Sequence, residues 1–338
     1  MAKVTVLMPT YNVAPYVRQA VESVLQQTFS DFQLLVIDDC STDDTVVTVR
    51  SITDPRIRIV QNERNLGLAE NLNRGLELTD TELVARMDGD DIALPHWLQS
   101  EVDYLDAHPN VGVCGGGFER FGSVTSLVRF PENHEDIAAN MLFECTIAVP
   151  TFRMDIVREH GLRYRSEDFP AEDYGFWVEM LRFTQFHNIP DTLFRYRMHP
   201  SQICSSRREE QRAKVDTVRR RMLFRMSDEL SDNDLQYFCN TFASNIIASR
   251  DDLRQRLAFA NRLVSLNSKT QRIDPQSLLA RLKKHLRLAL YHTATSTTFS
   301  DGYSIGRYIQ YLQSGLALKT GCRLESKMLI KSLLHSKQ

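Results

Sequence analysis

The chain has 338 residues, 42% of them hydrophobic and 25% charged, which is the composition of a globular protein large enough for two or three domains. No stretch approaches 18 consecutive apolar residues, and the N-terminal apolar run breaks at Pro9, so neither a membrane-spanning helix nor a secretory signal is expected. The six cysteines are scattered without Cys-x-x-Cys or zinc-type spacing, which favours reduced thiols in a cytosolic protein.

The net charge of −2 hides an asymmetry between the two parts of the chain. Residues 1–204 carry 17 Lys+Arg against 31 Asp+Glu, whereas residues 205–338 carry 24 against 12. The acidic part fits a site that holds cations. The basic part fits an anionic partner, such as a membrane surface, lipid-linked phosphates or nucleic acid, or simply solvated basic helices.

Short apolar strands alternate with helices through the first third of the chain. The strands are expected at Val4–Met8, Leu34–Ile37, Ile57–Val60, Leu83–Met87 and Val111–Gly115, and the helices at Val13–Gln27, Asp43–Ile52, from the Asn65-Leu66-Gly67 turn to Thr79, and at Pro95–Ala107. This alternation predicts an α/β fold with a mostly parallel sheet covered on both faces. Ligands of such sheets gather beyond the carboxyl ends of the strands, where residues 9–12, 38–43 and 88–91 form polar clusters.

The remainder of the chain is mixed to about Ser205 and then helical. Helices are expected at Tyr174–Phe183, Arg207–Met226, Asp232–Ser249, Asp251–Leu266, Asp274–Tyr291 and Tyr303–Leu318. Charge balance and hydrophobic period both change near Cys204–Arg208, so we expect domains at residues 1–205 and 206–338. The leucine face and basic flanks of residues 278–292 predict either an interfacial helix on anionic lipid or an amphipathic helix packed on the catalytic domain.

An acidic cluster follows the expected strand that ends at Met87. Asp88, Asp90 and Asp91 fall within four residues, and the first two are two apart, so in an extended chain both side chains leave the same side. A hard divalent cation such as Mg²⁺ or Mn²⁺ would relieve their repulsion, because such ions take oxygen ligands. The alternative is an acidic surface turn.

Several nucleotide-binding and hydrolytic sites are excluded. A dinucleotide-binding site needs glycines in its first strand-to-helix turn, and here that turn, Pro9–Val13, has none. The chain also has no Gly-x-x-x-x-Gly-Lys-Ser/Thr phosphate loop and no Gly-x-Ser-x-Gly nucleophile elbow. The remaining use for a divalent ion at the edge of such a sheet is to hold a diphosphate.

A set of motifs, in this order along the chain, resembles the family 2 glycosyltransferases. They are Pro9-Thr-Tyr-Asn12, Asp38-Asp-Cys-Ser-Thr-Asp43, Asn65-Leu-Gly67, Asn73-Arg-Gly75, Arg86-Met-Asp-Gly-Asp-Asp91, Ala171-Glu-Asp-Tyr-Gly-Phe-Trp177 and Tyr196-Arg-Met-His199. The resemblance covers about residues 3–205. It implies the GT-A fold, with nucleotide binding in about residues 1–115 and acceptor binding in about residues 116–205, and an inverting reaction on a nucleotide sugar.

The resemblance also implies roles for single residues. Asp173 is the expected general base, and the metal would be held by Asp90, Asp88 and His199. The donor nucleotide sugar would contact Pro9, Thr10, Tyr11, Asn12, Asp39, Asn65, Gly67, Asp88 and Arg197. Glu172 and Trp177 are candidates for the acceptor side. Capping is an alternative role for Asp173, core packing for Trp177 and a structural hydrogen bond for His199. Many relatives have a histidine where this chain has Val149, which leaves the donor sugar open.

The expected function is therefore an inverting transfer from a UDP-sugar, with Mn²⁺ or Mg²⁺, to a hydroxyl of a glycan or lipid-linked acceptor in polysaccharide or glycolipid synthesis. Two alternatives are a nucleotidyltransferase and a non-catalytic module that binds nucleotide sugars. We expect a cytoplasmic enzyme with no nucleic-acid partner, in peripheral contact with the membrane through the basic C-terminal helices.

Overall fold

A computed structural model of the protein describes residues 2–199, 202 and 207–295. The chain divides into two compact units, one of residues 1–137 with 144–218 and the other of residues 138–143 with 219–338. The expected helix at Tyr303–Leu318 lies outside the described residues. Within the part of the chain that the structure describes, no helix is both long enough and apolar enough to span a bilayer.

A nine-stranded sheet forms the centre of the first unit. Its strands are β1 (Val4–Thr10), β2 (Phe32–Asp38), β3 (Ile57–Gln61), β4 (Leu83–Arg86), β5 (Ile92–Ala93), β6 (Val111–Gly122), β7 (Ser126–Val128), β8 (Thr151–Arg153) and β9 (Gln185–Met198). They are ordered β3-β2-β1-β4-β8-β6-β9-β5, with β7 beside β6. The β3-β2-β1-β4 block and the β6-β9 pair are parallel, whereas β8, β5 and β7 run antiparallel to their neighbours.

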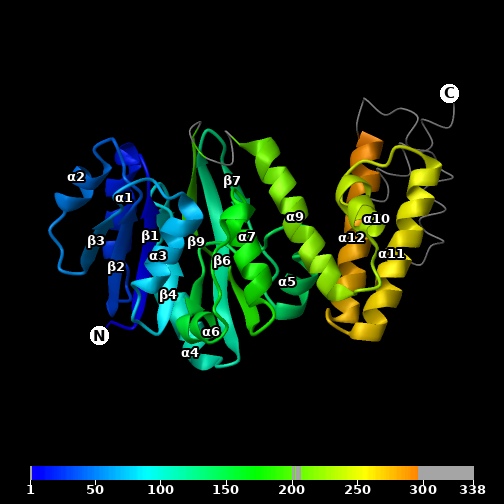
Figure 1. Ribbon diagram of the computed structural model, residues 1–338, viewed down its shortest axis with the longest axis horizontal. Helices are drawn as coiled ribbons and strands as arrows, with labels where there is room; N and C mark the ends of the chain where they lie inside the picture. Colours follow the sequence, from blue (N-terminus) through cyan, green and yellow to red (C-terminus); the bar gives the residue numbers. More distant parts are fainter. Residues whose placement is uncertain (1, 200–201, 203–206, 296–338) are drawn as a thin grey trace. The chain divides into compact units, whose positions relative to one another are not determined.

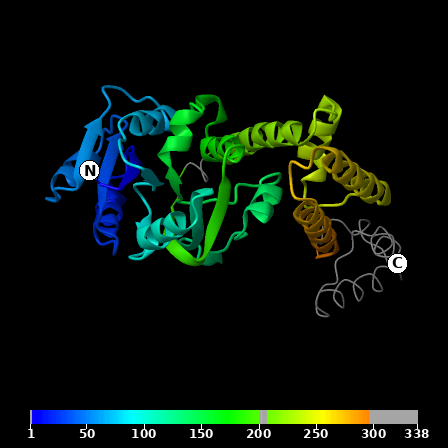
Figure 2. The same ribbon diagram turned by 90° about the horizontal axis from the view of Figure 1, so that it is seen from below.

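Helices cover both faces of this sheet, as the alternating sequence pattern predicts (Figures 1 and 2). The helices of this unit are α1 (Ala14–Leu25), α2 (Thr45–Arg50), α3 (Leu68–Glu77), α4 (Trp97–Ala107), α6 (Met154–Glu159), the 3₁₀ turn η1 (Ser166–Asp168) and α7 (Glu172–Met180), whereas α5 (His134–Asn140) and α9 (Arg208–Met226) each continue into residues of the second unit. Buried side chains of α1 and α4 form one core with Val4, Val6 and Met8. On the other face α3 approaches β1 closely, since a Cβ on Gly75 would lie 2.2 Å from Leu7 Cδ1.

The first strand is longer than the sequence predicts. We expected it to stop at Pro9, but β1 continues to Thr10 and pairs with β2 up to Asp38. Pro9 has the same orientation as Leu7, whose carbonyl accepts the Met87 N–H on the β4 side at 3.1 Å. Because β4 ends at Arg86, no partner on that side needs the N–H that proline lacks.

The second unit is helical. It contains α10 (Asp232–Tyr237), the π-helical stretch Phe238–Phe242, α11 (Arg250–Thr270) and α12 (Pro275–Thr295). The prediction of one helix from Asp232 to Ser249 is wrong, because the chain leaves helical geometry after Phe242. Ser249 then caps α11 by accepting the Asp252 N–H at 3.1 Å.

The leucine face of α12 is part of a protein core. Leu278, Leu282, Leu286 and Leu290 are each 0% exposed. This face is therefore not available to lie on lipid. α11 and α12 belong to the second unit, so packing of α12 on the catalytic domain stays a prediction.

Candidate active site

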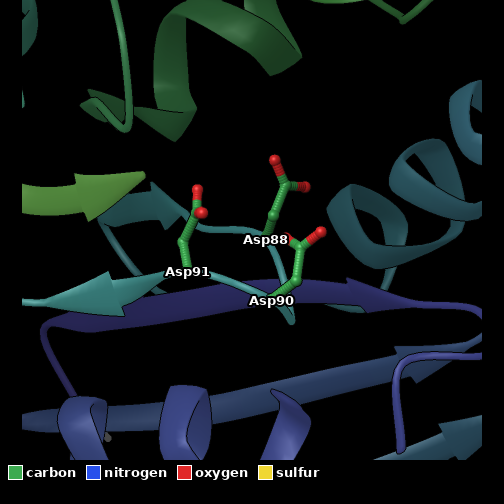
Figure 3. A group of neighbouring side chains, drawn as sticks. All are labelled: Asp88, Asp90 and Asp91. Carbon is green, nitrogen blue, oxygen red and sulfur yellow. The ribbon is translucent and has the colours of Figure 1, made fainter. Parts of the chain in front are cut away.

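The acidic cluster lies in the loop that leaves the carboxyl end of β4. Asp88, Asp90 and Asp91 each offer one carboxylate oxygen within 4.8 Å of the others, and all three side chains project to the same side of the loop (Figure 3). Gly89 allows this loop to pack against the end of β1, since a Cβ there would lie 2.9 Å from Thr10 Cγ2. The loop is therefore anchored to the polar segment that follows β1.

The end of β9 fixes the same loop from the other side. The Arg197 backbone N–H donates to Asp91 Oδ1 at 2.8 Å, and Arg197 Nε donates to the Asp90 carbonyl at 2.7 Å. His199 Nε2 lies 3.1 Å from Asp90 Oδ2, and its ring packs against Tyr16 at 4.6 Å. Two residues predicted for this site, Arg197 and His199, are thus brought to the acidic cluster.

The electrostatics of the cluster fit a divalent cation. Burial raises the pKa of Asp90 and Asp91, and the charge of Asp88 raises both further, while His199 partly offsets the shift at Asp90. Ionised together, these carboxylates repel one another in a poorly hydrated position. Since a hard cation binds carboxylate oxygens and removes this repulsion, Asp88, Asp90 and Asp91 have the right chemistry to hold Mg²⁺ or Mn²⁺, with His199 beside them.

Asp39 organises the loop between β3 and α3. Its Oδ1 accepts Asn62 Nδ2 at 2.7 Å and the Leu66 N–H at 2.8 Å, and its Oδ2 accepts the Gly67 N–H at 2.9 Å. Asn65 Nδ2 also donates to the Asp39 carbonyl. The side chain of Asp39 is buried, so most of its hydrogen-bonding capacity is used within the protein rather than offered to a base.

The segment after β1 lies at the same edge of the sheet. Thr10 is buried and donates to Asp38 at 3.2 Å, whereas Tyr11 is 49% exposed. Asn12 adopts a positive φ of 53°, and its Oδ1 accepts the Thr42 N–H at 2.9 Å. Pro9, also buried, belongs to β1 itself. In this segment Tyr11 and Asn12 have exposed side chains.

Asp173 is tied to the acidic cluster through a buried arginine. Arg86, the last residue of β4, places Nη1 2.8 Å from Asp88 Oδ2 and Nη2 3.2 Å from Asp173 Oδ2. The Asp173 side chain is 32% exposed, yet its Oδ1 is buried without a hydrogen-bond partner. Burial raises the pKa of Asp173, Arg86 lowers it in part, and Asp88 raises it again.

Glu172, next to Asp173 in the first turn of α7, is 5% exposed and has an unpartnered buried Oε2. Its burial, with the charge of Asp173, raises its pKa to about 8. A carboxyl that keeps its proton offers a hydrogen-bond donor as well as an acceptor.

Trp177 belongs to the core instead of the acceptor side. It is 1% exposed and packs edge-on against Phe152 and Phe176, with ring centroids 5.4 Å and 4.9 Å away. Val149 is also buried, at a positive φ of 44° that is strained for a β-branched residue. Its carbonyl accepts Trp97 Nε1 at 3.1 Å.

Two residues near Asp173 were given no role from the sequence. Arg86 is the only charged residue in β4, whose other residues are apolar. Because a buried charge needs a partner, a charged residue in this apolar strand could have indicated from the sequence that Arg86 pairs with an acid. Tyr164 is buried with its hydroxyl unpartnered, and Asn73 on α3 holds it by bonding both its backbone N–H and its carbonyl. No sequence pattern pointed to that hydroxyl.

Comparison with known proteins adds three findings. Residues 5–164 match the model of "Glycosyl transferase family 2". An uncharacterized glycosyltransferase of Haemophilus influenzae is 34% identical over 233 residues, which is 64% of this chain and 72% of that protein. The Escherichia coli UDP-Glc:alpha-D-GlcNAc-diphosphoundecaprenol beta-1,3-glucosyltransferase WfgD is 26% identical over 220 residues, covering 64% of this chain and 85% of the other.

The fold is also found among solved structures. The structure of TarS from S. aureus in complex with UDP-GlcNAc aligns over 99% of this chain and 90% of its own, with a TM-score of 0.59. The two sequences are 16% identical, so this likeness concerns the fold alone.

Proposed function

This chain belongs to glycosyl transferase family 2, and from that premise we propose that it inverts the anomeric centre of a UDP-sugar while transferring the sugar to a hydroxyl of a lipid-linked glycan. The observation that carries the proposal is the Arg86 bridge, which places the carboxylate of Asp173 beside the acidic cluster. Family membership sets aside the nucleotidyltransferase alternative. The non-catalytic alternative has no use for Asp173.

Asp173 serves as the general base in this proposal. A sugar hydroxyl is a weak nucleophile unless its proton is removed as it attacks, and a positioned carboxylate provides about 10²- to 10⁴-fold in rate. The raised pKa of Asp173 makes it a better proton acceptor than an ordinary surface aspartate. Inversion then follows from a single displacement at the anomeric carbon.

The donor lies across the carboxyl ends of β1, β2 and β4 in this proposal. Tyr11 is accessible to the base, and Asp88, Asp90 and His199 would hold Mn²⁺ or Mg²⁺. A bound divalent ion supplies neutralisation of the charge that develops on the leaving diphosphate. The guanidinium of Arg197 already contacts the Asp90 carbonyl and Gln19, so its part is to hold the loop next to the diphosphate.

One relative supports the choice of donor and acceptor. WfgD is named as an enzyme that takes UDP-Glc as donor and a diphosphoundecaprenol-linked sugar as acceptor. An acceptor of this kind carries a diphosphate on a lipid, and residues 205–338 have a charge balance of +12.

A thermal-shift screen tests the donor assignment. UDP with Mn²⁺ is expected to raise the melting temperature, and GDP with Mn²⁺ or UDP with EDTA is expected to give little shift, because only ligands of the native state stabilise it. A UDP-sugar that stabilises further identifies the sugar. A larger shift with GDP than with UDP would contradict the UDP assignment but leave the reaction class intact.

We place the enzyme at the cytoplasmic face of the membrane, held by charge rather than by an inserted helix. The apolar face of α12 is buried, while Lys284 on its flank is exposed. Such contact gains about 1 kcal/mol per basic residue near an anionic surface and weakens with salt. We expect cosedimentation with phosphatidylglycerol vesicles at low salt and none with phosphatidylcholine; equal recovery with both would contradict it.

A further inference from the structure

We propose that Arg86 is a positioning residue of the transfer reaction, which acts by fixing the general base Asp173 relative to the donor-side carboxylate Asp88. The inference rests on the function proposed above. Among the residues that the structure describes, Arg86 is the one buried cation that contacts both the acidic cluster and Asp173.

The two terminal nitrogens of the Arg86 guanidinium each contact a different aspartate. Arg86 Nη1 lies 2.8 Å from Asp88 Oδ2, and Nη2 lies 3.2 Å from Asp173 Oδ2. The arginine side chain is 9% exposed, whereas the two aspartates are about a third exposed. A planar guanidinium presents its N–H groups in a fixed arrangement, so the positions of the two carboxylates are set against each other.

The backbone at Arg86 is held on both sides. β4 pairs with β1 up to Leu7 and Arg86, and the Arg86 N–H donates to the Pro150 carbonyl at 3.1 Å. The base of the side chain is thus rigid, which a positioning group requires, since an error of about 1 Å in the reacting geometry can cost about 10²-fold in rate. Asp173 lies in the first turn of α7, far from Arg86 in the sequence, and this contact connects it to the end of β4.

Other charged or titratable groups also face Asp173. Asp88 lies beyond β4, Glu172 is its neighbour on α7, Tyr164 precedes η1, and Cys145 belongs to the segment before β8. None of these is a cation at neutral pH. Arg86 is therefore the group that favours the ionised form of Asp173 against burial and against Asp88.

A purely structural role is the competing explanation, because removing one partner of a buried ion pair destabilises most proteins. Arg153 on the adjacent strand β8 provides a matched control. It is 15% exposed, pairs with Glu82 and donates to the carbonyls of Val111 and Leu105, without touching the acidic cluster. Both arginines hold the same region of the sheet, and only Arg86 reaches Asp173.

The test is a double-mutant cycle with Arg86→Lys and Asp173→Asn in the full chain, using the UDP-sugar found by the screen. Lysine keeps the charge but cannot contact both acids in a fixed plane. We expect Arg86→Lys to lower kcat about 10- to 100-fold with the donor KM changed less than about threefold. Arg153→Lys should change kcat less than about twofold even if its melting temperature falls as much.

The cycle separates the inference from the proposed function. If Arg86 acts through Asp173, Arg86→Lys has no further effect on the residual rate of Asp173→Asn. Equal fold losses in both backgrounds would overturn the positioning role and leave the base assignment standing. Full activity of Asp173→Asn would overturn both. Should Arg86→Lys fail to fold, Arg86→Gln takes its place in the same cycle.

Discussion

Asp173→Asn is expected to lower the rate of sugar transfer by at least about 10²-fold while the affinity for the metal and nucleotide is kept. Asparagine has nearly the same shape but cannot accept the proton of the attacking hydroxyl. It leaves Arg86 in contact with Asp88, so the donor side of the site retains its geometry. The measurement is product formation with the identified donor, alongside calorimetric titration of UDP and Mn²⁺.

Asp54→Asn is the matched control for this variant. Asp54 also pairs with an arginine, Arg56, at 2.9 Å and is 19% exposed. It precedes β3, so it lies at the amino end of that strand, whereas the candidate site lies beyond the carboxyl ends of the strands. We expect its transfer rate to equal that of the wild type. A transfer rate of Asp173→Asn within about threefold of the wild type would leave Asp173 only as an acid in the first turn of α7 that pairs with Arg86.

The pH profile provides a second result for the same residue. The base must be ionised to act, and burial raises its pKa above the ordinary aspartate value of 3.8. The value of kcat/KM should therefore fall as the pH is lowered through that raised pKa, and rise to a plateau above it. An acid limb that persists unchanged in the residual activity of Asp173→Asn would assign the limb to another group.

Asp90→Asn should abolish the metal-dependent part of nucleotide binding, the second large effect that the site predicts. The substitution removes a charge from the acidic cluster. It also removes the carboxylate oxygen, Asp90 Oδ2, that His199 Nε2 contacts. Loss of a direct ligand should exceed the 10- to 100-fold cost typical of groups that only support the ligands, so we expect an affinity for Mn²⁺ with UDP at least about 10²-fold weaker.

Calorimetry with UDP in the presence and absence of Mn²⁺ measures this effect. Asp103→Asn on α4 is the control, because Asp103 is an exposed acid that accepts a hydrogen bond from Gln99. It should bind as the wild type does. Unchanged Mn²⁺-dependent binding in Asp90→Asn would move the metal away from the acidic cluster.

Much of the first unit could be predicted from local pattern. Each buried strand of the β3-β2-β1-β4 block is a short apolar run, and the loops that follow β1, β2 and β4 must then meet at one edge of a parallel sheet. Asp88, Asp90 and Asp91 are adjacent in sequence, so their convergence needs no long-range information. The arrival of Arg197 and His199 was suggested by the family motifs alone.

The parts that escaped prediction depend on contacts between distant residues. The Arg86 bridge joins β4 to α7, and the hydrogen bonds of Asp39 join β2 to the loop before α3, so neither is visible in a local pattern. In the second unit, Arg256 on α11 donates to the carbonyls of Phe242, Ser244 and Ile246. These bonds satisfy backbone groups that a continuous helix would have paired, and so permit the break after Phe242.

The central claim is that one divalent ion is held by the loop after β4, across from Asp173. Anomalous scattering from crystals of the full chain grown with Mn²⁺ and UDP tests this most directly. The account predicts a single strong manganese peak in contact with Asp90, next to the UDP diphosphate, with Asp173 still paired to Arg86. A manganese peak away from Asp88, Asp90 and Asp91, or UDP bound elsewhere, would contradict it.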